Sequence, residues 1–210
     1  MYFVPEMIIT RAQVASLTAG LWDEAEQLMQ SLAVDVGKAT ISFGGSVGVA
    51  RGMMLLRQGR TTAALASLLE SCDGLAHSDP QQLLGYCSAM AAYAAAKSGR
   101  LDTARELVRQ YSEDTGMFIV VAHERAFIAA AREYLDGDGA GIAELFSLAD
   151  DLHARGQFTA ELNALALLLE FEPSQARRRI LAIATQVEGR WAAGWPPLPR
   201  RLSKEALQCW

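Results

Sequence analysis

The sequence predicts an all-α protein, an α-solenoid of about five antiparallel helical hairpins. The composition is that of a folded chain, because 51% of the 210 residues are hydrophobic and 20% are charged. Alanine and leucine dominate, and β-branched and aromatic residues never gather in alternating runs, which favours helices over strands. A repeat along the chain and apolar residues at helical spacing support the same class.

A glycine recurs at nearly constant spacing. Gly20, Gly59, Gly99 and Gly139 are separated by 39, 40 and 40 residues. An alanine follows five residues after each of the first three, whereas Glu144 occupies that place in the fourth unit. The positions nine after and twelve before each glycine are all apolar: Met29, Leu68, Val108, Leu148, Ile8, Val47, Cys87 and Phe127. A period of about 40 residues indicates one helical hairpin used repeatedly.

Start and stop signals divide the chain into ten predicted helices. Gly99 and Gly156 end helices, because a residue without Cβ adopts the left-handed conformation needed there. Asp79 is the expected cap of a helix with Pro80 in its first turn, and Pro173 opens the last helix. The stretch 37–45 is expected to be a glycine-containing loop. The helices cover 6–19, 22–36, 46–58, 61–73, 80–98, 101–113, 117–136, 141–155, 158–171 and 174–188.

Two domains are predicted. Residues 1–189 form the helical-repeat domain, and residues 190–210 form an irregular tail rich in Trp and Pro. Repeat arrays expose apolar surface at their ends unless they are capped. We expect Trp191 or Trp195 to cap the last hairpin; the alternative is self-association through the tail, as in a homodimer.

Charge and cysteine content restrict the compartment and the partners. The net charge is −5, with +5 on residues 173–210 and −10 on the rest, so direct nucleic-acid binding is not expected. No apolar run approaches the roughly 18 residues of a membrane span, and no secretory signal is visible. Three scattered cysteines favour a reducing cytoplasm. Cys72 and Cys87 are expected as buried small hydrophobes and Cys209 as an exposed thiol.

Three stretches resemble catalytic motifs, but each lacks a required residue. Lys38 is followed by Ala39, where a phosphate-binding loop needs Ser or Thr. His123 is followed one turn later by Phe127, where a zinc protease needs a second His. Asp150-Asp151 precedes Ala154, where a diphosphate-metal motif needs a third Asp. We therefore predict no catalysis, no cofactor and no metal.

The remaining candidate for function is the surface of the array. In stacked hairpins the first helices usually line a concave face that binds peptides or small ligands. The alternative for each candidate is an ordinary role, the apolar side chains in the core and the arginines keeping the surface soluble. The contact candidates are Arg51, Tyr86, Met90, Tyr93, Arg125 and Asn163.

Residues 86–194 resemble the helical-repeat region of the large ATP-dependent LuxR-type transcriptional regulators, the maltose-activator-like signal-transduction ATPases. The resemblance is greatest where Ala154-Arg155-Gly156-Gln157 ends a helix before an apolar helix. Glu172-Pro173 and Val187-Glu188-Gly189 follow at the places of two further breaks in that family. The repeats are tetratricopeptide-like, although the strict 34-residue signature is not met.

The resemblance implies a cytoplasmic signal-sensing segment without its ATPase and DNA-binding modules, a fragment or truncated product. Its partner would be a protein or peptide, or a small-molecule inducer. One alternative is a freestanding tetratricopeptide-like adaptor that binds a peptide or partner protein. The third reading, an all-α enzyme, would need a polar pocket with converging carboxylates or histidines.

Overall fold

The computed structural model describes residues 11, 24, 27, 28, 40–79, 82–111 and 118–187, and the regular structure of these residues is entirely helical. The predicted all-α class is therefore confirmed. The predicted helices 6–19 and 22–36, apart from those four isolated residues, and the tail 190–210 with its tryptophans lie outside the described residues. The helices are α3 (Thr40–Arg57), α4 (Thr61–His77), α5 (Leu84–Lys97), α6 (Leu101–Gln110), α7 (Phe118–Asp136), α8 (Ala140–Ala154), α9 (Phe158–Leu168) and α10 (Pro173–Ile183), followed by a 3-10 turn η1 (Ala184–Gln186).

Gly45, Gly48 and Gly52 of α3 belong to a helix–helix contact, and the prediction of a loop over 37–45 is wrong from Thr40 onward. A Cβ on Gly48 would lie 2.0 Å from Ser71 Oγ, and one on Gly52 would lie 2.5 Å from Leu68 Cδ2. Both partners are on α4, which extends to His77 instead of ending at residue 73. The missing side chains therefore allow α3 and α4 to approach closely.

The start of α5 differs from the prediction by four residues. The helix begins at Leu84 instead of at Pro80, and Gln82 before it has a positive φ of 54°. Asp79 still satisfies the helix start, because its two carboxylate oxygens accept hydrogen bonds from Leu83 N and Leu84 N, each at 2.8 Å. The Asp79 carboxylate therefore accepts hydrogen bonds from the helix start as predicted, although the first turn lies later in the chain than predicted.

Two of the recurring glycines form the same turn. Gly59 and Gly99 have φ of +72° and +78°, and the N–H of each following arginine bonds to the carbonyl oxygen five residues back. The alanines of this column, Ala64 and Ala104, are both fully buried. The repeat register is therefore confirmed for these two units.

The fourth unit has a different turn. Gly137 and Gly139 both have positive φ, and α8 begins directly after Gly139. Here the close contact is at Gly141, where a Cβ would lie 2.3 Å from the carbonyl oxygen of Ala129 on α7. Glu144, which replaces the alanine, is partly buried and pairs with Arg132 at 3.0 Å.

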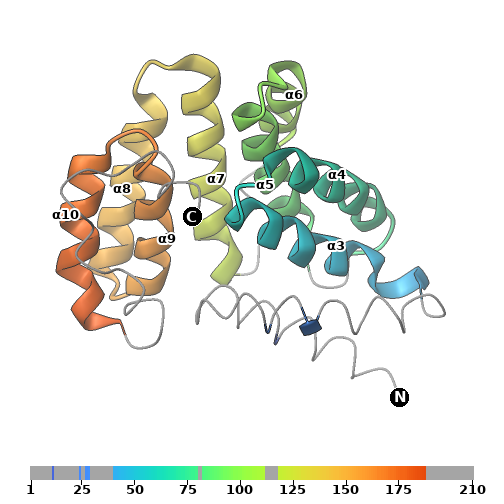
Figure 1. The fold of residues 1–210 in the computed structure, drawn as a ribbon, viewed down its shortest axis with the longest axis horizontal. Helices are drawn as coiled ribbons and strands as arrows, with labels where there is room; N and C mark the ends of the chain where they lie inside the picture. Colours follow the sequence, from blue (N-terminus) through green and yellow to red (C-terminus); the bar gives the residue numbers. More distant parts are fainter. Residues whose placement is uncertain are drawn as a thin grey trace.

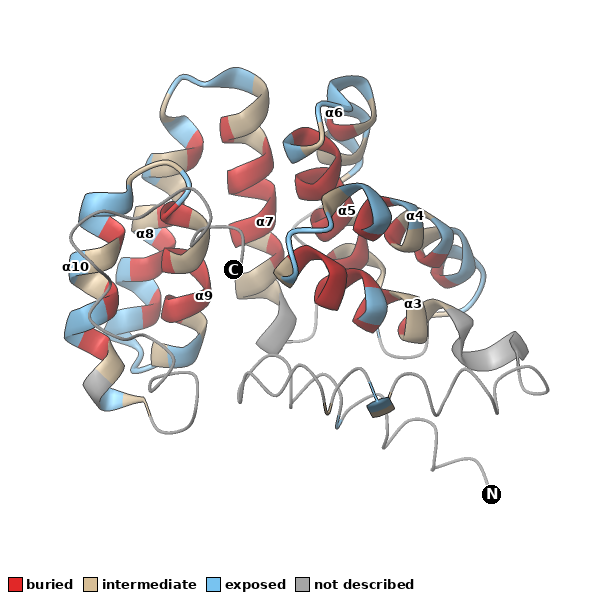
Figure 2. Ribbon diagram, viewed as in Figure 1, coloured by how far each residue is buried: buried red, intermediate tan, exposed pale blue. Residues whose placement is uncertain are grey.

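Neighbours in sequence are neighbours in space. Each described helix packs against the next one in the chain, and the odd-numbered helices also pack against one another, α3 on α5, α5 on α7 and α7 on α9. Figure 1 shows the chain passing from α3 and α4 on one side to α9 and α10 on the other. Buried residues gather on the central helices α5 and α7 (Figure 2). Ten of the 14 residues of α5 are buried, and alanine permits this crowding because it is small and favours helix.

Among the described residues, no helix combines the length and apolar character needed to cross a membrane.

Candidate functional site

The odd-numbered helices surround one cavity of about 60 Å³. In the described part of the chain its walls come from these helices and from the turn after α9, with no residue from α4, α6, α8 or α10. The arrangement is the one expected if the first helix of each hairpin faces a common groove. The lining residues are Met53, Leu56, Arg57, Tyr93, His123, Ala126, Phe127, Asn163, Ala166, Leu167, Leu169 and Glu170.

The volume of the cavity limits what can enter it. A cavity needs about 10–15 Å³ to hold one water molecule, so this cavity has room for about four to six waters. Pockets for drug-sized ligands measure about 300–1,000 Å³. The cavity therefore suits a single apolar side chain or a comparably small group, not a whole cofactor.

One wall of the cavity is a polar bridge between α3, α7 and α9. Arg57 donates a hydrogen bond to Asn163 Oδ1, which fixes the orientation of the amide, since guanidinium groups cannot accept. Asn163 Nδ2 then donates to Thr159 O at 3.0 Å and to His123 Nε2 at 3.1 Å. His123 Nε2 accepts this bond in the tautomer that carries the ring proton on Nδ1. Burial lowers the pKa of Arg57 from its usual value.

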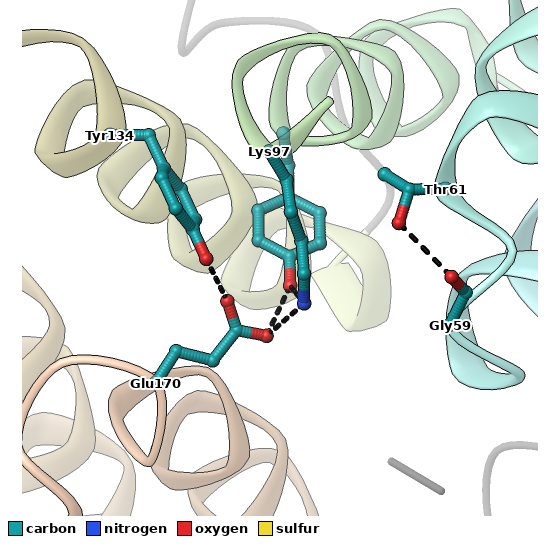
Figure 3. Close-up of polar contacts among 6 residues, drawn as sticks. Gly59, Thr61, Lys97, Tyr134 and Glu170 are labelled. Carbon is teal, nitrogen blue, oxygen red and sulfur yellow. Dashed lines mark hydrogen bonds and ion pairs between the residues drawn. The ribbon is translucent and has the colours of Figure 1, made fainter. Parts of the chain in front are cut away.

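The opposite wall is organised by Glu170. Its carboxylate accepts hydrogen bonds from the hydroxyls of Tyr93 (2.6 Å) and Tyr134, and it pairs with Lys97. Figure 3 shows the carboxylate between Tyr134 and Lys97, with Thr61 bonded to the carbonyl of Gly59 nearby. Burial, with the Glu170 charge adding to it, raises the pKa of both tyrosines, so both remain protonated donors.

A row of aromatic rings underlies the two walls. Phe127 lies 6.1 Å from Tyr86 and 5.4 Å from Tyr93, measured between ring centroids. Tyr134 continues the row, 6.2 Å from Tyr93 and 5.0 Å from Phe171. Tilted and edge-on contacts of this kind contribute about 0.5–1.5 kcal/mol each beyond burial. Two rings of the row, Tyr93 and Phe127, also line the cavity.

The structure separates the six predicted contact residues. Tyr93 and Asn163 line the cavity. Tyr86 is 4% exposed beneath it, with its hydroxyl 3.7 Å from Met53 Sδ. Met90 is fully buried, so it packs in the core and offers no contact surface. Arg51 is exposed on α3 and does not line the cavity.

Arg125 belongs to a different hollow, of about 300 Å³, between α7 and α8. Arg155 and Asp151 also line this hollow. The Nε of Arg125 is buried and has no hydrogen-bond partner among the described residues. The chain from 112 to 117, which precedes α7, lies outside those residues.

Four polar residues around the cavity were not predicted as contact residues: Arg57, Lys97, His123 and Glu170. A signal existed for two of them, because Arg57 and Lys97 each stand two residues before a recurring glycine, Gly59 and Gly99. A cation at this place in the repeat is the last residue of an odd-numbered helix and lies beside the cavity. No comparable pattern marks His123 or Glu170.

Glu124, the neighbour of His123, is 1% exposed at the contact between α7 and α5. Neither carboxylate oxygen has a hydrogen-bond partner among the described residues, and burial raises the pKa of the carboxyl. Both oxygens face the first turn of α5, since a Cβ on Gly85 would lie 3.1 and 3.2 Å from them. A helix N-terminus favours a negative charge, which offsets part of the cost of burial.

The described residues contain no group of three or more His, Cys, Asp or Glu arranged to hold a metal ion. Comparison of the chain with known protein families, with curated proteins and with solved structures gives no match.

Proposed function

We propose that the chain is a non-catalytic α-solenoid of tetratricopeptide-like hairpins that binds a peptide or a segment of a partner protein in the groove formed by α3, α5, α7 and α9. The observation that carries the proposal is the cavity itself, whose described walls come from these four helices and the turn after α9. A site assembled from each odd-numbered helix that the structure describes is what a shared concave face would provide.

The size and chemistry of the cavity favour a peptide side chain as its occupant. Leu56, Phe127 and Leu167 supply apolar walls, and the available volume matches one branched aliphatic side chain. Arg57 and Asn163 supply polar groups at the wall of the cavity. The main chain of a bound peptide carries both hydrogen-bond donors and acceptors that can pair with such groups. Recognition would then combine one buried anchor with main-chain hydrogen bonds.

The biological setting that we propose is signal sensing within a LuxR-type regulator, on the basis of the resemblance of residues 86–194. In that setting the peptide or protein bound in the groove is the signal, and ATP and DNA are bound by other modules. The freestanding adaptor uses the same groove without those modules. The reading frame on both sides of this segment distinguishes them, because the regulator requires a phosphate-binding ATPase upstream and a helix-turn-helix domain downstream.

Binding in the groove can be tested by filling the cavity. Peptides are selected from a displayed random library against the chain, and the affinity of one fluorescently labelled selected peptide is measured by anisotropy. Ala166 lines the cavity on α9, so Ala166→Leu places additional carbons in it. Ala66→Leu on the exposed face of α4 is the matched control. We expect a loss of affinity of about tenfold or more for Ala166→Leu, since every 1.4 kcal/mol is tenfold, and no change for Ala66→Leu.

Equal affinity of both variants would mean that the peptide binds elsewhere, and the proposed groove would be rejected. A small-molecule inducer is tested with the same pair of variants in a thermal-shift screen. Stabilisation by a small molecule that Ala166→Leu abolishes, without any peptide binding, would replace the peptide by that ligand.

A further inference from the structure

Two thiols that are 15 residues apart in the sequence meet between α4 and α5. Cys72 Sγ lies 3.3 Å from Cys87 Sγ. Both cysteines are in the free thiol state. Neither the repeat nor any motif indicated this pairing, since Cys72 and Cys87 have no recognised spacing. The expectation that both are inert apolar packing residues accounts for the burial of Cys87 but not for the proximity of the two sulfur atoms.

The separation is short enough for a covalent bond after a small movement. A disulfide measures about 2.05 Å, so the sulfur atoms must approach by a little over 1 Å. Rotation of Cys72, which is only partly buried, supplies part of that movement. The helices that carry the two cysteines already pack against each other, so no rearrangement of the fold is required.

The two cysteines have different surroundings, and the difference suits two chemical roles. Cys72 is partly exposed, and its sulfur lies 3.6 Å from Ser88 Oγ as well as next to the Cys87 sulfur. The Cys72 thiol donates a hydrogen bond to the Cys87 sulfur, and as the partly exposed member of the pair Cys72 is the sulfur that an oxidant from solvent reaches first. Cys87 is fully buried and its thiol donates to Leu68 O at 3.3 Å. The contact with Cys72 and burial both raise the pKa of Cys87, and Leu68 O accepts its proton, so this thiol stays protonated and unreactive until a neighbouring sulfur is activated.

We propose that Cys72 and Cys87 form a redox-responsive pair, in which a hydroperoxide oxidises Cys72 and Cys87 resolves the product as an intramolecular disulfide. With hydrogen peroxide, the Cys72 thiol loses its proton as its sulfur attacks one oxygen. The O–O bond breaks, Cys72 keeps that hydroxyl as a sulfenic acid, and the other hydroxyl leaves with the thiol proton as one water. The Cys87 sulfur then attacks the Cys72 sulfur. The S–S bond forms, and the sulfenic hydroxyl leaves with the Cys87 proton as a second water. The two thiols lose two electrons in total, and the peroxide gains them.

A metal-binding role for the pair is less well supported. Two thiolates leave a soft metal ion with half of a usual tetrahedral ligand set, and no further His, Cys, Asp or Glu completes a group of three among the described residues. A reversible disulfide also agrees with the predicted reducing compartment, where such bonds are transient. The proposal goes beyond the groove and does not depend on what binds there.

The experiment uses the full chain with Cys209→Ser, so that two thiols remain, and hydrogen peroxide as the oxidant. After brief oxidation the protein is denatured, alkylated with N-ethylmaleimide and weighed by mass spectrometry. We expect the loss of both alkylation sites, a mass lower by two hydrogen atoms, and migration as a monomer without reductant. Proteolysis should yield one linked pair of peptides containing Cys72 and Cys87, and dithiothreitol should restore both thiols.

Variants of each cysteine separate the roles. In Cys87→Ala the Cys72 sulfur should gain oxygen atoms without forming a cross-link, and in Cys72→Ser the Cys87 thiol should remain alkylatable at the same peroxide dose. Circular dichroism checks that both variants fold, and Cys87→Ser serves if the alanine variant does not. Retention of both thiols in the parent protein, addition of oxygen to both without linkage, or faster oxidation of Cys87 than of Cys72 would each overturn the proposal.

Discussion

The odd-numbered and even-numbered helices alternate along the chain, but they differ in how many of their residues are buried. Ten residues of α5 are buried, whereas Ala104 is the one buried residue of α6. The difference arises because α5 packs against helices on several sides, α3, α4, α6 and α7, while α6 covers one edge and faces solvent with its charged residues. α5 therefore contributes to both the core and the cavity, whereas α6 mainly shields apolar surface from water.

The largest effect is expected when a core-facing side chain is truncated on an odd-numbered helix and compared with the same change on an even-numbered helix. Met90 on α5 is fully buried and Leu107 on α6 is partly buried. Met90→Ala should lower the free energy of unfolding by about 2–5 kcal/mol, since it leaves a cavity. Leu107→Ala should lower it by about 1 kcal/mol, because less apolar area is lost. Urea denaturation of both variants gives the two values, and equal losses would end the distinction.

An even-numbered helix can nevertheless be tied to the core by charge. Arg179 of α10 bonds to Glu161 Oε1 at 3.1 Å, and Glu161 is 1% exposed. Arg179→Met should cost about 2–3 kcal/mol, below the 3–5 kcal/mol of a fully buried pair, because His153 still bonds to Glu161. Arg109→Met removes an exposed pair with Glu106 on α6 and should leave the stability unchanged within the error of the measurement. A similar effect of both substitutions in thermal or urea unfolding would contradict the buried role of Glu161.

Two glycines on even-numbered helices should respond to alanine with opposite signs. Gly141→Ala places a methyl group 2.3 Å from Ala129 O, so α8 must move away from α7 at a cost of about 1–3 kcal/mol. Gly74→Ala on α4 meets its nearest atoms at 3.6 and 3.7 Å, an ordinary contact. Its helix propensity should then raise stability by about 0.5–1 kcal/mol. Stabilisation by Gly141→Ala would show that α7 and α8 are packed less closely than described.

The smallest expected effect is the free-energy cost of burying the Glu124 carboxyl on α7, an odd-numbered helix. Burial raises the pKa of Glu124 in the folded state, so the folded protein binds this proton more tightly than the unfolded chain does. Stability should therefore fall as the pH rises from the unfolded pKa, about 4.3, through the raised folded pKa, and then level off. Glu124→Gln should remove this fall and add about 1 kcal/mol at pH 7. A Glu124→Gln variant that is less stable at pH 7 would instead indicate that α5 needs the negative charge at its first turn.

Much of the fold could be predicted from local chemistry. Gly59, Gly99 and Gly156 end helices with positive φ, and Pro173 begins α10, as their backbone preferences require. Predictions failed where a local signal had a tertiary purpose. Gly45 of α3 was predicted to lie in a loop, but it allows contact with Leu75 of α4, where a Cβ would lie 2.6 Å from Cγ. The helix predicted to start at Pro80 begins at Leu84, with Asp79 still accepting its first N–H groups.

The candidate site could be predicted only in part. The odd-numbered helices were the expected location, and Tyr93 and Asn163 were named in advance. Met90 could not be distinguished from them, because apolar periodicity marks a face of a helix without saying whether another helix covers it.

What the sequence determined by itself is the class of structure, the position of most turns and the repeated unit, since these depend on residues that are close in the chain. Tertiary structure alone decided which distant side chains meet. Arg57 reaches Asn163 across 106 residues, Lys97 reaches Glu170 across 73, and two thiols come into contact between α4 and α5. The reason is geometric, because such contacts depend on how all the helices between the two residues pack against one another, and a local apolar pattern does not encode that packing.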